Sequence, residues 1–330
     1  MRVLLWHVHG SWTTAFVQGG HDYLLPVVPD RGPDGLGRAR TWDWPASAVE
    51  LTPEQLRGSP APDVVVMQRQ RDAELLQRPR DLELARAHLR REPGADLPAI
   101  WVEHNTPRGD VADATHPLAD RSDVVLAHVT NFNEVFWDSG RAPTTVIEHG
   151  VVDPGLRWTG ELPRAAVAVN EPVRRGRVTG TDLLPHFATE VPLDVFGMGV
   201  RGLGEHLGLS PELLTEHDDP PQARLHEEMA RRRVYLHPLR WTSLGLSLIE
   251  AMHLGMPVVA LAATEAAEAV PPGAGVVSTR VGVLRAALRE LVNDHALARE
   301  TGLAARRAAL DRYGLGRFLD DWDQLLKEVT

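Results

Sequence analysis

The sequence predicts an α/β protein with two doubly wound domains, each built on a parallel sheet that helices cover on both faces. Short, continuously apolar runs rich in β-branched residues alternate with amphipathic segments such as 80–91 and 222–233. Strands of this kind are buried on both faces, which is typical of parallel sheets. The runs fall into two series, at 3–8, 63–67, 99–103, 123–128 and 144–147, and at 165–169, 193–196, 234–237, 257–261 and 275–277.

Between the two series, residues 151–165 (VVDPGLRWTGELPRA) are rich in proline and glycine and lack the periodicity of a helix or strand. This composition indicates a linker. Ligands of doubly wound domains bind at the carboxyl ends of the strands. With two such domains, we expect Rossmann-like halves that face each other across a cleft, and an active site in that cleft.

The composition excludes several classes of protein. The chain has 330 residues, 43% of them hydrophobic, which is enough for the cores of two domains. Its net charge of -10 argues against a nucleic-acid partner, because that binding needs basic surface to displace counterions. There is no cysteine, and therefore no disulfide, thiolate nucleophile or cysteine metal site. Lys327 is the only lysine, so arginine must provide the positive charge wherever phosphate is held.

We expect neither a membrane span nor a secretory leader. The N-terminus, MRVLLWHVHG, has a short apolar run interrupted by His7 and His9. No later run approaches about 20 apolar residues, the length that a spanning helix needs. The expectations are a cytoplasmic protein and no strong membrane association.

Residues 240–260 (RWTSLGLSLIEAMHLGMPVVA) combine a glycine turn, a helix at 246–254 and an apolar strand. The N–H groups of Ser243, Leu244 and Gly245 would lie at the start of this helix, where unpaired donors and the helix dipole favour an anion. Glu250, within the helix, would suit the hydroxyls of a ribose. The spacing supports a second interpretation equally well, in which Ser243 is an ordinary N-cap and Glu250 is a surface acid.

The same stretch resembles the signature of the retaining GT-B glycosyltransferases of the large family-4-like group, PSxxEGFGLxxLEAMAxGxPVVA, named E-x7-E for its two glutamates. Residues 237–246 match its first part, and residues 249–252 and 255–260 match its second part. In that family the second glutamate binds the nucleotide ribose, which is the role the resemblance implies for Glu250. The first glutamate, which contacts the transferred sugar, is replaced here by Thr242.

Further segments resemble the same family along almost the whole chain. Gly10 and Ser11 stand where the family has a glycine-rich loop, residues 20–24 resemble its second strand, and residues 146–153 (VIEHGVVD) resemble its VIPNGVD. The last match closes the N-terminal domain. The resemblance therefore implies an acceptor-side domain at 1–153, a donor domain at 154–314, and a final helix at 315–330 that packs back on the N-terminal domain.

Residues 170–180 (NEPVRRGRVTG) occupy the place of the family's GRLxxxKG, whose arginine and lysine grip the donor diphosphate. Arg174 aligns with the arginine, whereas Thr179 replaces the lysine. Because guanidinium groups bind phosphate oxygens well, Arg175 or Arg177 would supply the missing charge. Any single arginine on a surface loop is more often merely solvated.

Other candidates follow strand ends. The resemblance implies that Gly197, in FGMG, lies near the nucleotide base and that Glu268 orders the phosphate-side loop. It implies that His104 contacts the donor sugar. The residues that would line the sugar or acceptor site are Trp12, Asn131 and His149. Glu103 would orient His104. Tryptophans and lone histidines are more often structural, which is the alternative for Trp12 and His104.

No metal is expected. The one DxD, at 321–323, falls in a predicted helix at 316–327, where alternate residues point to different faces. No HExxH or similar ligand set is present. Enzymes that resemble this chain need no divalent ion, and many react by front-face attack in which the departing phosphate accepts the acceptor's proton.

The predicted function is that of a retaining, metal-independent hexosyltransferase that moves a sugar from a nucleotide-diphosphate sugar to a soluble small-molecule or glycan acceptor. His104, Arg174 and Glu250 are its principal residues. The other donor-binding candidates are Gly10, Ser11, Arg175, Arg177, Gly197, Thr242, Ser243, Leu244, Gly245, Leu246 and Glu268. Two alternatives stay open: a catalytically reduced nucleotide-binding or regulatory protein, because Thr242 and Thr179 replace a glutamate and a lysine, and a sugar-nucleotide epimerase.

Overall fold

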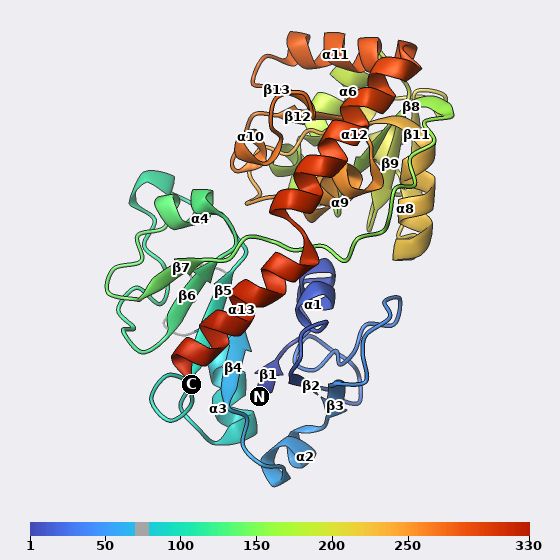
Figure 1. Ribbon diagram of the computed structural model, residues 1–330. Coiled ribbons are helices and arrows are strands. Elements are labelled where there is room, and N and C mark those ends of the chain that lie inside the picture. The colour runs from blue at the N-terminus through green and yellow to red at the C-terminus, as the bar shows by residue number, and fades with distance from the viewer. Residues whose placement is uncertain (70–78) are drawn as a thin grey trace. The chain divides into compact units, whose positions relative to one another are not determined.

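The computed structural model describes residues 1–69 and 79–330 (Figure 1). The chain forms two compact units. Unit 1 comprises Met1–Val152 together with Leu315–Thr330, and unit 2 comprises Asp153–Gly314. Both units are α/β, so the predicted fold class, two doubly wound parallel-sheet domains, is confirmed.

Unit 1 contains a seven-stranded sheet in the order β3-β2-β1-β4-β5-β6-β7, in which all paired strands are parallel. Its strands are β1 (Arg2–Leu5), β2 (Asp22–Pro26), β3 (Ala48–Leu51), β4 (Val64–Met67), β5 (Ala99–Glu103), β6 (Val125–His128) and β7 (Thr144–Val146). Its helices are α1 (Gly10–Phe16), α2 (Pro53–Gly58), α3 (Arg80–Leu89), α4 (Asn131–Phe136) and α13 (Leu315–Val329). The central strands β4 and β5 are buried at every position, and their sequences are apolar apart from Glu103 at the end of β5.

The C-terminal helix α13 completes the core of unit 1. Its buried Trp322 packs edge-on against Trp12 and Phe16 of α1, with ring centroids 5.5 and 5.0 Å apart. Phe318 on the same face is also fully buried, and Gly150 lies against it, where a Cβ atom would overlap the phenyl ring. The last residues of the chain are therefore part of the fold of unit 1.

Unit 2 contains a six-stranded parallel sheet in the order β10-β9-β8-β11-β12-β13. Its strands are β8 (Leu162–Ala168), β9 (Leu193–Gly197), β10 (Leu214–Asp218), β11 (Arg232–His237), β12 (Val258–Leu261) and β13 (Gly275–Ser278). Its helices are α5 (Pro172–Arg175), α6 (Leu184–Ala188), α7 (Leu203–Leu207), α8 (Gln222–Arg231), α9 (Leu246–Leu254), α10 (Ala266–Ala269), α11 (Val281–Asn293) and α12 (His295–Arg312).

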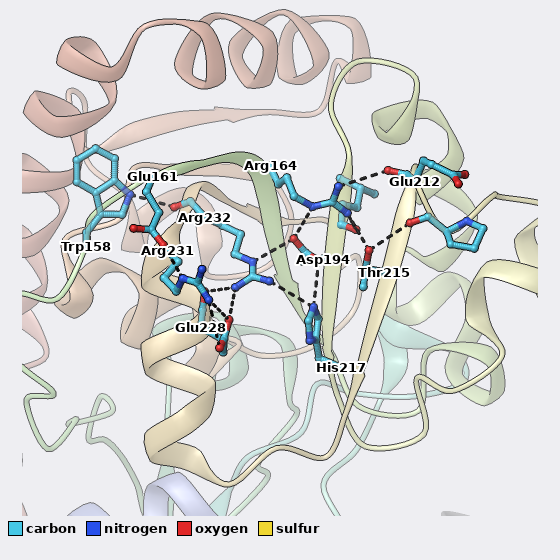
Figure 2. A network of polar contacts seen from close by, with 12 residues as sticks. Trp158, Glu161, Arg164, Asp194, Glu212, Thr215, His217, Glu228, Arg231 and Arg232 are labelled. Atoms are coloured by element: carbon cyan, nitrogen blue, oxygen red, sulfur yellow. Dashed lines mark hydrogen bonds and ion pairs between the residues drawn. The ribbon is translucent and has the colours of Figure 1, made fainter.

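A buried polar network joins strands β8, β9, β10 and β11 (Figure 2). The Asp194 carboxylate accepts hydrogen bonds from Arg164 Nε at 2.6 Å, Arg232 Nε at 3.0 Å and His217 Nε2 at 3.0 Å. Arg232 also donates to Glu228 of α8 at 2.6 Å. Asp194 and Arg232 are both buried. The network ties α8 to the sheet.

Each apolar run in the two predicted series overlaps a strand, but the series omit β2, β3 and β10. β2 was expected through the family resemblance of residues 20–24, so β3 and β10 are the strands missed altogether. Both missed strands are at sheet edges, and their sequences, AVEL and LTEHD, are largely half-exposed. An edge strand has one solvated side, so it lacks the continuous apolar signal of a central strand. The predicted helix 222–233 was too long, because β11 begins at Arg232.

Candidate functional site

The turn before α9 is shaped by a close contact with a histidine. Gly245 is the N-cap of α9, with φ -70° and ψ 115°. A Cβ atom on Gly245 would lie 2.5 Å from Cε1 of His237, whose ring is buried at the end of β11. The backbone dihedrals suit any residue, so it is the histidine ring that requires glycine here.

The loop that precedes Gly245 is anchored through its carbonyl groups. The Thr264 hydroxyl donates to the carbonyl of Thr242 at 2.7 Å, and the N–H of Glu265 donates to the carbonyl of Ser243 at 3.3 Å. Ser243 and its neighbour Leu244 are buried, whereas Leu246, the first residue of α9, is half-buried. The loop therefore leads into a fixed helix N-terminus, where the first backbone N–H groups have no partner within the helix.

Glu250 lies on α9 and is only 4% exposed. Its Oε2 atom accepts a hydrogen bond from Gln222 Nε2 at 3.0 Å and lies 3.3 Å from His226 Nε2. The interpretation of Ser243 as N-cap and Glu250 as a surface acid is therefore wrong, because Gly245 is the N-cap and Glu250 is buried. A buried, hydrogen-bonded carboxylate on this helix is consistent with a binding role.

The arginine-rich segment and the loop before α9 are hydrogen-bonded to each other. The N–H groups of Arg240 and Trp241 donate to the carbonyl of Val178 at 2.9 and 3.2 Å. Arg240 also forms a bidentate pair with Asp182, at 2.5 and 2.9 Å. Gly180, with φ +72°, packs so closely on the carbonyl of Pro238 that a Cβ atom would overlap it. Both segments follow carboxyl ends of adjacent strands, β8 and β11.

The predicted phosphate-binding arginines lie on the outside of this assembly. Arg174 is 71% exposed and donates from Nε to Glu171 at 2.7 Å. Arg177 is 77% exposed and pairs with Asp182 at 2.9 Å. Arg175 is half-buried. Exposed ion pairs of this kind are weak, so their carboxylate partners hold Arg174 and Arg177 only loosely.

Thr179, which stands in place of the family's lysine, is 1% exposed. Its hydroxyl donates to the carbonyl of Gly176 at 3.0 Å and lies 3.0 Å from that of Thr181. It therefore stabilises the turn and cannot reach a ligand. Sequence reasoning missed Arg240 as a functional candidate, although it lies within the signature stretch; its pairing with Asp182, 58 positions away, has no local signal.

Two further donor-side candidates are Gly197, the last residue of β9, and Glu268, which follows β12. Gly197 has φ +137°, and a Cβ atom there would overlap the carbonyl of Val169. Glu268 lies on α10 with its side chain exposed, and its carbonyl accepts from Arg312 at 2.6 Å. The buried acid of this region is Glu265, which accepts from Arg312 at 2.9 Å. Glu265 thus ties this loop to Arg312, and the role expected for the Glu268 carboxylate stays a prediction.

In unit 1, three histidines gather beyond the carboxyl ends of strands. The ring of His104 lies 4.0 Å from that of His9 and 6.2 Å from that of His149, measured between centroids. His104 Nε2 lies 3.2 Å from Oε1 of Gln68, whose amide nitrogen donates to the carbonyl of Trp6. His104 and His149 were predicted from sequence, whereas His9 and Gln68 were not.

Burial keeps these imidazoles neutral. It lowers the pKa of His9 to about 4 and the pKa of His149 to about 3, and it holds the pKa of His104 well below its usual value. A neutral imidazole offers one donor and one acceptor, which suits the hydroxyl groups of a sugar.

Acidification should destabilise unit 1 through this cluster. An unfolded imidazole takes up its proton near pH 6.5, and the folded ones do so only near pH 4 or below, so the unfolded state binds more protons in this window and stability falls as the pH is lowered. His149→Asn should reduce the slope of unfolding free energy against pH by about 1.4 kcal/mol per pH unit between about pH 4 and 6. Urea denaturation at a series of pH values measures the slope, and equal slopes would contradict a neutral buried His149.

Glu103 does not orient His104, contrary to expectation. Its carboxylate is fully buried and accepts from the N–H of Asn105 at 2.6 Å, from the Trp101 indole at 3.2 Å and from His116 Nε2 at 3.0 Å. Glu103 and His104 are consecutive at the end of β5, so their side chains point in different directions.

The remaining candidates of unit 1 have mixed positions. Trp12 is 0% exposed in the core beside Trp322, so its predicted role in lining the acceptor site is wrong. Gly10 begins α1 and is half-buried, as is Ser11. Asn131, the first residue of α4, is exposed.

Within residues 1–69 and 79–330, no three histidine, aspartate or glutamate side chains are grouped so that they can bind a metal ion. No helix in this part of the chain has the length and apolar character needed to cross a membrane.

Comparisons with known proteins agree with the geometry. Residues 203–308 match the family model "Glycosyl transferases group 1". Sucrose-phosphate synthase from Thermosynechococcus elongatus is 14% identical with a TM-score of 0.71, over 99% of this chain and 98% of that one. Anabaena Alr3699/HepE in complex with UDP and glucose is 15% identical with a TM-score of 0.66, over 99% and 100%. A glycosyltransferase from Rickettsia africae ESF-5 is 12% identical with a TM-score of 0.65, over 99% and 98%. No curated protein matches the sequence.

These structural matches span nearly the whole of each chain, so the fold is GT-B. The family match covers residues 203–308, a stretch that includes α8, the turn before α9 and Glu250.

Proposed function

We propose that this protein is a retaining, metal-independent glycosyltransferase that uses a nucleotide-diphosphate sugar and a small-molecule or glycan acceptor. One observation carries the proposal. The N-cap of α9 is Gly245, which packs closely against the ring of His237, and the same helix carries the buried Glu250. The match of this region to glycosyltransferase group 1, and the complexes of a structural neighbour with UDP, support it.

In this proposal unit 2 holds the donor nucleotide. The diphosphate lies at the N-terminus of α9, where backbone N–H groups and the helix dipole stabilise negative charge. Arg174 and Arg177 are exposed and complete its charge. Glu250 accepts hydrogen bonds from the ribose hydroxyls. The same cations and N–H groups stabilise the diphosphate as it leaves.

The reaction breaks the bond between the anomeric carbon and the β-phosphate oxygen and forms a bond from that carbon to an acceptor oxygen on the same face. The electron pair of the broken bond stays on the diphosphate, which takes the proton of the acceptor hydroxyl. His104 and its neutral neighbours bind sugar hydroxyls without adding charge.

A second candidate is a nucleotide-binding protein with reduced catalysis. Thr179 favours it, because the residue in place of the phosphate-binding lysine is buried and hydrogen-bonded within its own turn. This candidate shares the nucleotide site and differs only in turnover.

Thermal-shift measurements with UDP, GDP, ADP and TDP and their common sugars, with and without magnesium, test the proposal. We expect one nucleotide series to stabilise the protein without magnesium, and its sugar conjugate to be hydrolysed slowly. NMR of the transfer product then gives the anomeric configuration. Stabilisation without turnover would favour the second candidate, and no stabilisation would reject both.

Arg174→Ala should weaken binding of the stabilising nucleoside diphosphate about three- to tenfold, because one charge-assisted hydrogen bond to phosphate is lost. Titration calorimetry measures the change. Arg299→Ala removes an exposed arginine from α12 and serves as the control. Unchanged affinity in Arg174→Ala would remove this residue from the diphosphate site.

A further inference from the structure

The carboxylate of Glu250 is held from a neighbouring helix. Two of its partners, Gln222 and His226, belong to α8, one at its first position and the other one turn later. Glu250 is 4% and His226 7% exposed, whereas Gln222 is half-buried. Of the three residues, Gln222 is therefore the one that reaches solvent.

The distances assign the hydrogen bonds. Gln222 Nε2 lies 2.7 Å from His226 Nε2 and 3.0 Å from Glu250 Oε2, and these are shorter than the 3.3 Å between His226 and Glu250. The two N–H groups of the amide thus donate one to each neighbour. Donation from the amide to His226 requires Nε2 of that ring to be the acceptor, which places the ring N–H on Nδ1.

The arrangement fixes a carboxyl group that would otherwise rotate. The terminal torsion of glutamate is broad, so a lone side chain samples many orientations. Here Oε2 is tied to the Gln222 amide, and that amide is itself tied to His226, which sets the plane of the carboxylate and the direction of Oε1. A fixed carboxylate can accept from two vicinal hydroxyl groups without further loss of side-chain entropy.

We propose that Gln222 and His226 are positioning residues that hold Glu250 for the ribose diol, and that they make this site select ribonucleotides over nucleotides that lack the diol. This inference rests on the proposed function, and it names two residues on α8 that lie outside the signature stretch. Arg224, on the same helix, is exposed and pairs only weakly with Glu228 at 3.4 Å, so it provides a matched control.

The test compares UDP with 2′,3′-dideoxy-UDP by titration calorimetry on the full chain. Wild type should bind UDP about tenfold more tightly than the dideoxy analogue, because two hydroxyl groups reach a charged acceptor. Gln222→Met should lose most of this preference, because the substitution should weaken the binding of UDP and leave the binding of the dideoxy analogue unchanged. His226→Leu removes the other anchor of the amide and should act in the same direction, while Arg224→Met keeps the wild-type preference.

The outcomes separate the inference from the function on which it rests. If Gln222→Met weakens the binding of both nucleotides equally, the role of Gln222 is merely structural and the inference is overturned. Equal affinity of the wild-type protein for UDP and its dideoxy analogue would show that Glu250 does not bind the ribose. This result would also overturn the inference, but it would leave the proposed nucleotide site intact. Failure to bind any of the four nucleoside diphosphates would reject the proposed function itself. If Gln222→Met does not fold, His226→Leu provides the test through the same ratio of the affinities for UDP and its dideoxy analogue.

Discussion

Asp194→Ala should lower the free energy of unfolding of unit 2 by about 3–5 kcal/mol, the usual cost of removing one partner from a buried ion pair. The carboxylate is the shared acceptor of Arg164, Arg232 and His217, and its loss leaves the buried guanidinium of Arg232 with Glu228 as its remaining carboxylate (Figure 2). Urea denaturation followed by circular dichroism measures the change. Because the network anchors α8, nucleotide binding should weaken together with stability.

Glu161→Ala is the control for this prediction. Glu161 and Arg231 form an ion pair at 2.6 Å, but their side chains are 52% and 41% exposed. An exposed pair contributes about 0–1 kcal/mol. Similar losses in the two variants would show that the Asp194 network is no stronger than a surface contact.

The network also makes the stability of unit 2 depend on pH in the acid range. Burial by itself raises the pKa of Asp194, but hydrogen bonds from His217, Arg232 and Arg164 outweigh it and lower the pKa below its usual value. A carboxyl group with a lowered pKa stabilises the fold above its unfolded pKa of about 3.9, and this stability is lost as the pH falls below that value. The variant should therefore lose less stability than wild type on acidification below about pH 4.

The central strands and α9 could be predicted because their signals are local. Continuous apolar runs identify strands that are buried on both faces, and α9 was predicted at 246–254, the bounds that it has. β3 and β10 were missed since an edge strand is half polar. Trp12 shows the limit of residue type as a guide, because an indole that could stack on a ligand instead fills the core beside α13.

The contacts that organise the candidate site join segments far apart in sequence. Gln222 reaches Glu250 across 28 positions, and Arg240 reaches Asp182 across 58. No spacing or periodicity reports such a pairing, because it depends on which strands are neighbours in the sheet. Arg174 and Glu250 were found through short motifs, whereas the residues that hold their surroundings in place required the structure.

Gly245→Ala should have the largest effect on nucleotide binding. A methyl group 2.5 Å from Cε1 of His237 lies well inside the normal carbon–carbon contact of about 3.5–4.0 Å, so the turn must move by about 1 Å or the ring must leave its buried place. Two misplaced charge-assisted hydrogen bonds to the diphosphate correspond to about 3 kcal/mol, or about a hundredfold in affinity. Gly282→Ala, in a position on α11 where a Cβ atom meets nothing within 4 Å, should leave affinity unchanged.

A second substitution identifies the cause. His237→Ala alone should destabilise unit 2 by leaving a cavity behind the turn. In combination with Gly245→Ala it removes the ring that the new methyl group meets, so the double variant should bind UDP more tightly than Gly245→Ala does, with a coupling energy of about 1 kcal/mol or more. Calorimetric titration of all four proteins completes the cycle. If the losses of UDP affinity in the two single variants are additive, glycine is required at position 245 for a reason other than His237. A favourable coupling energy would show that the contact with His237 determines the shape of the α9 N-terminus.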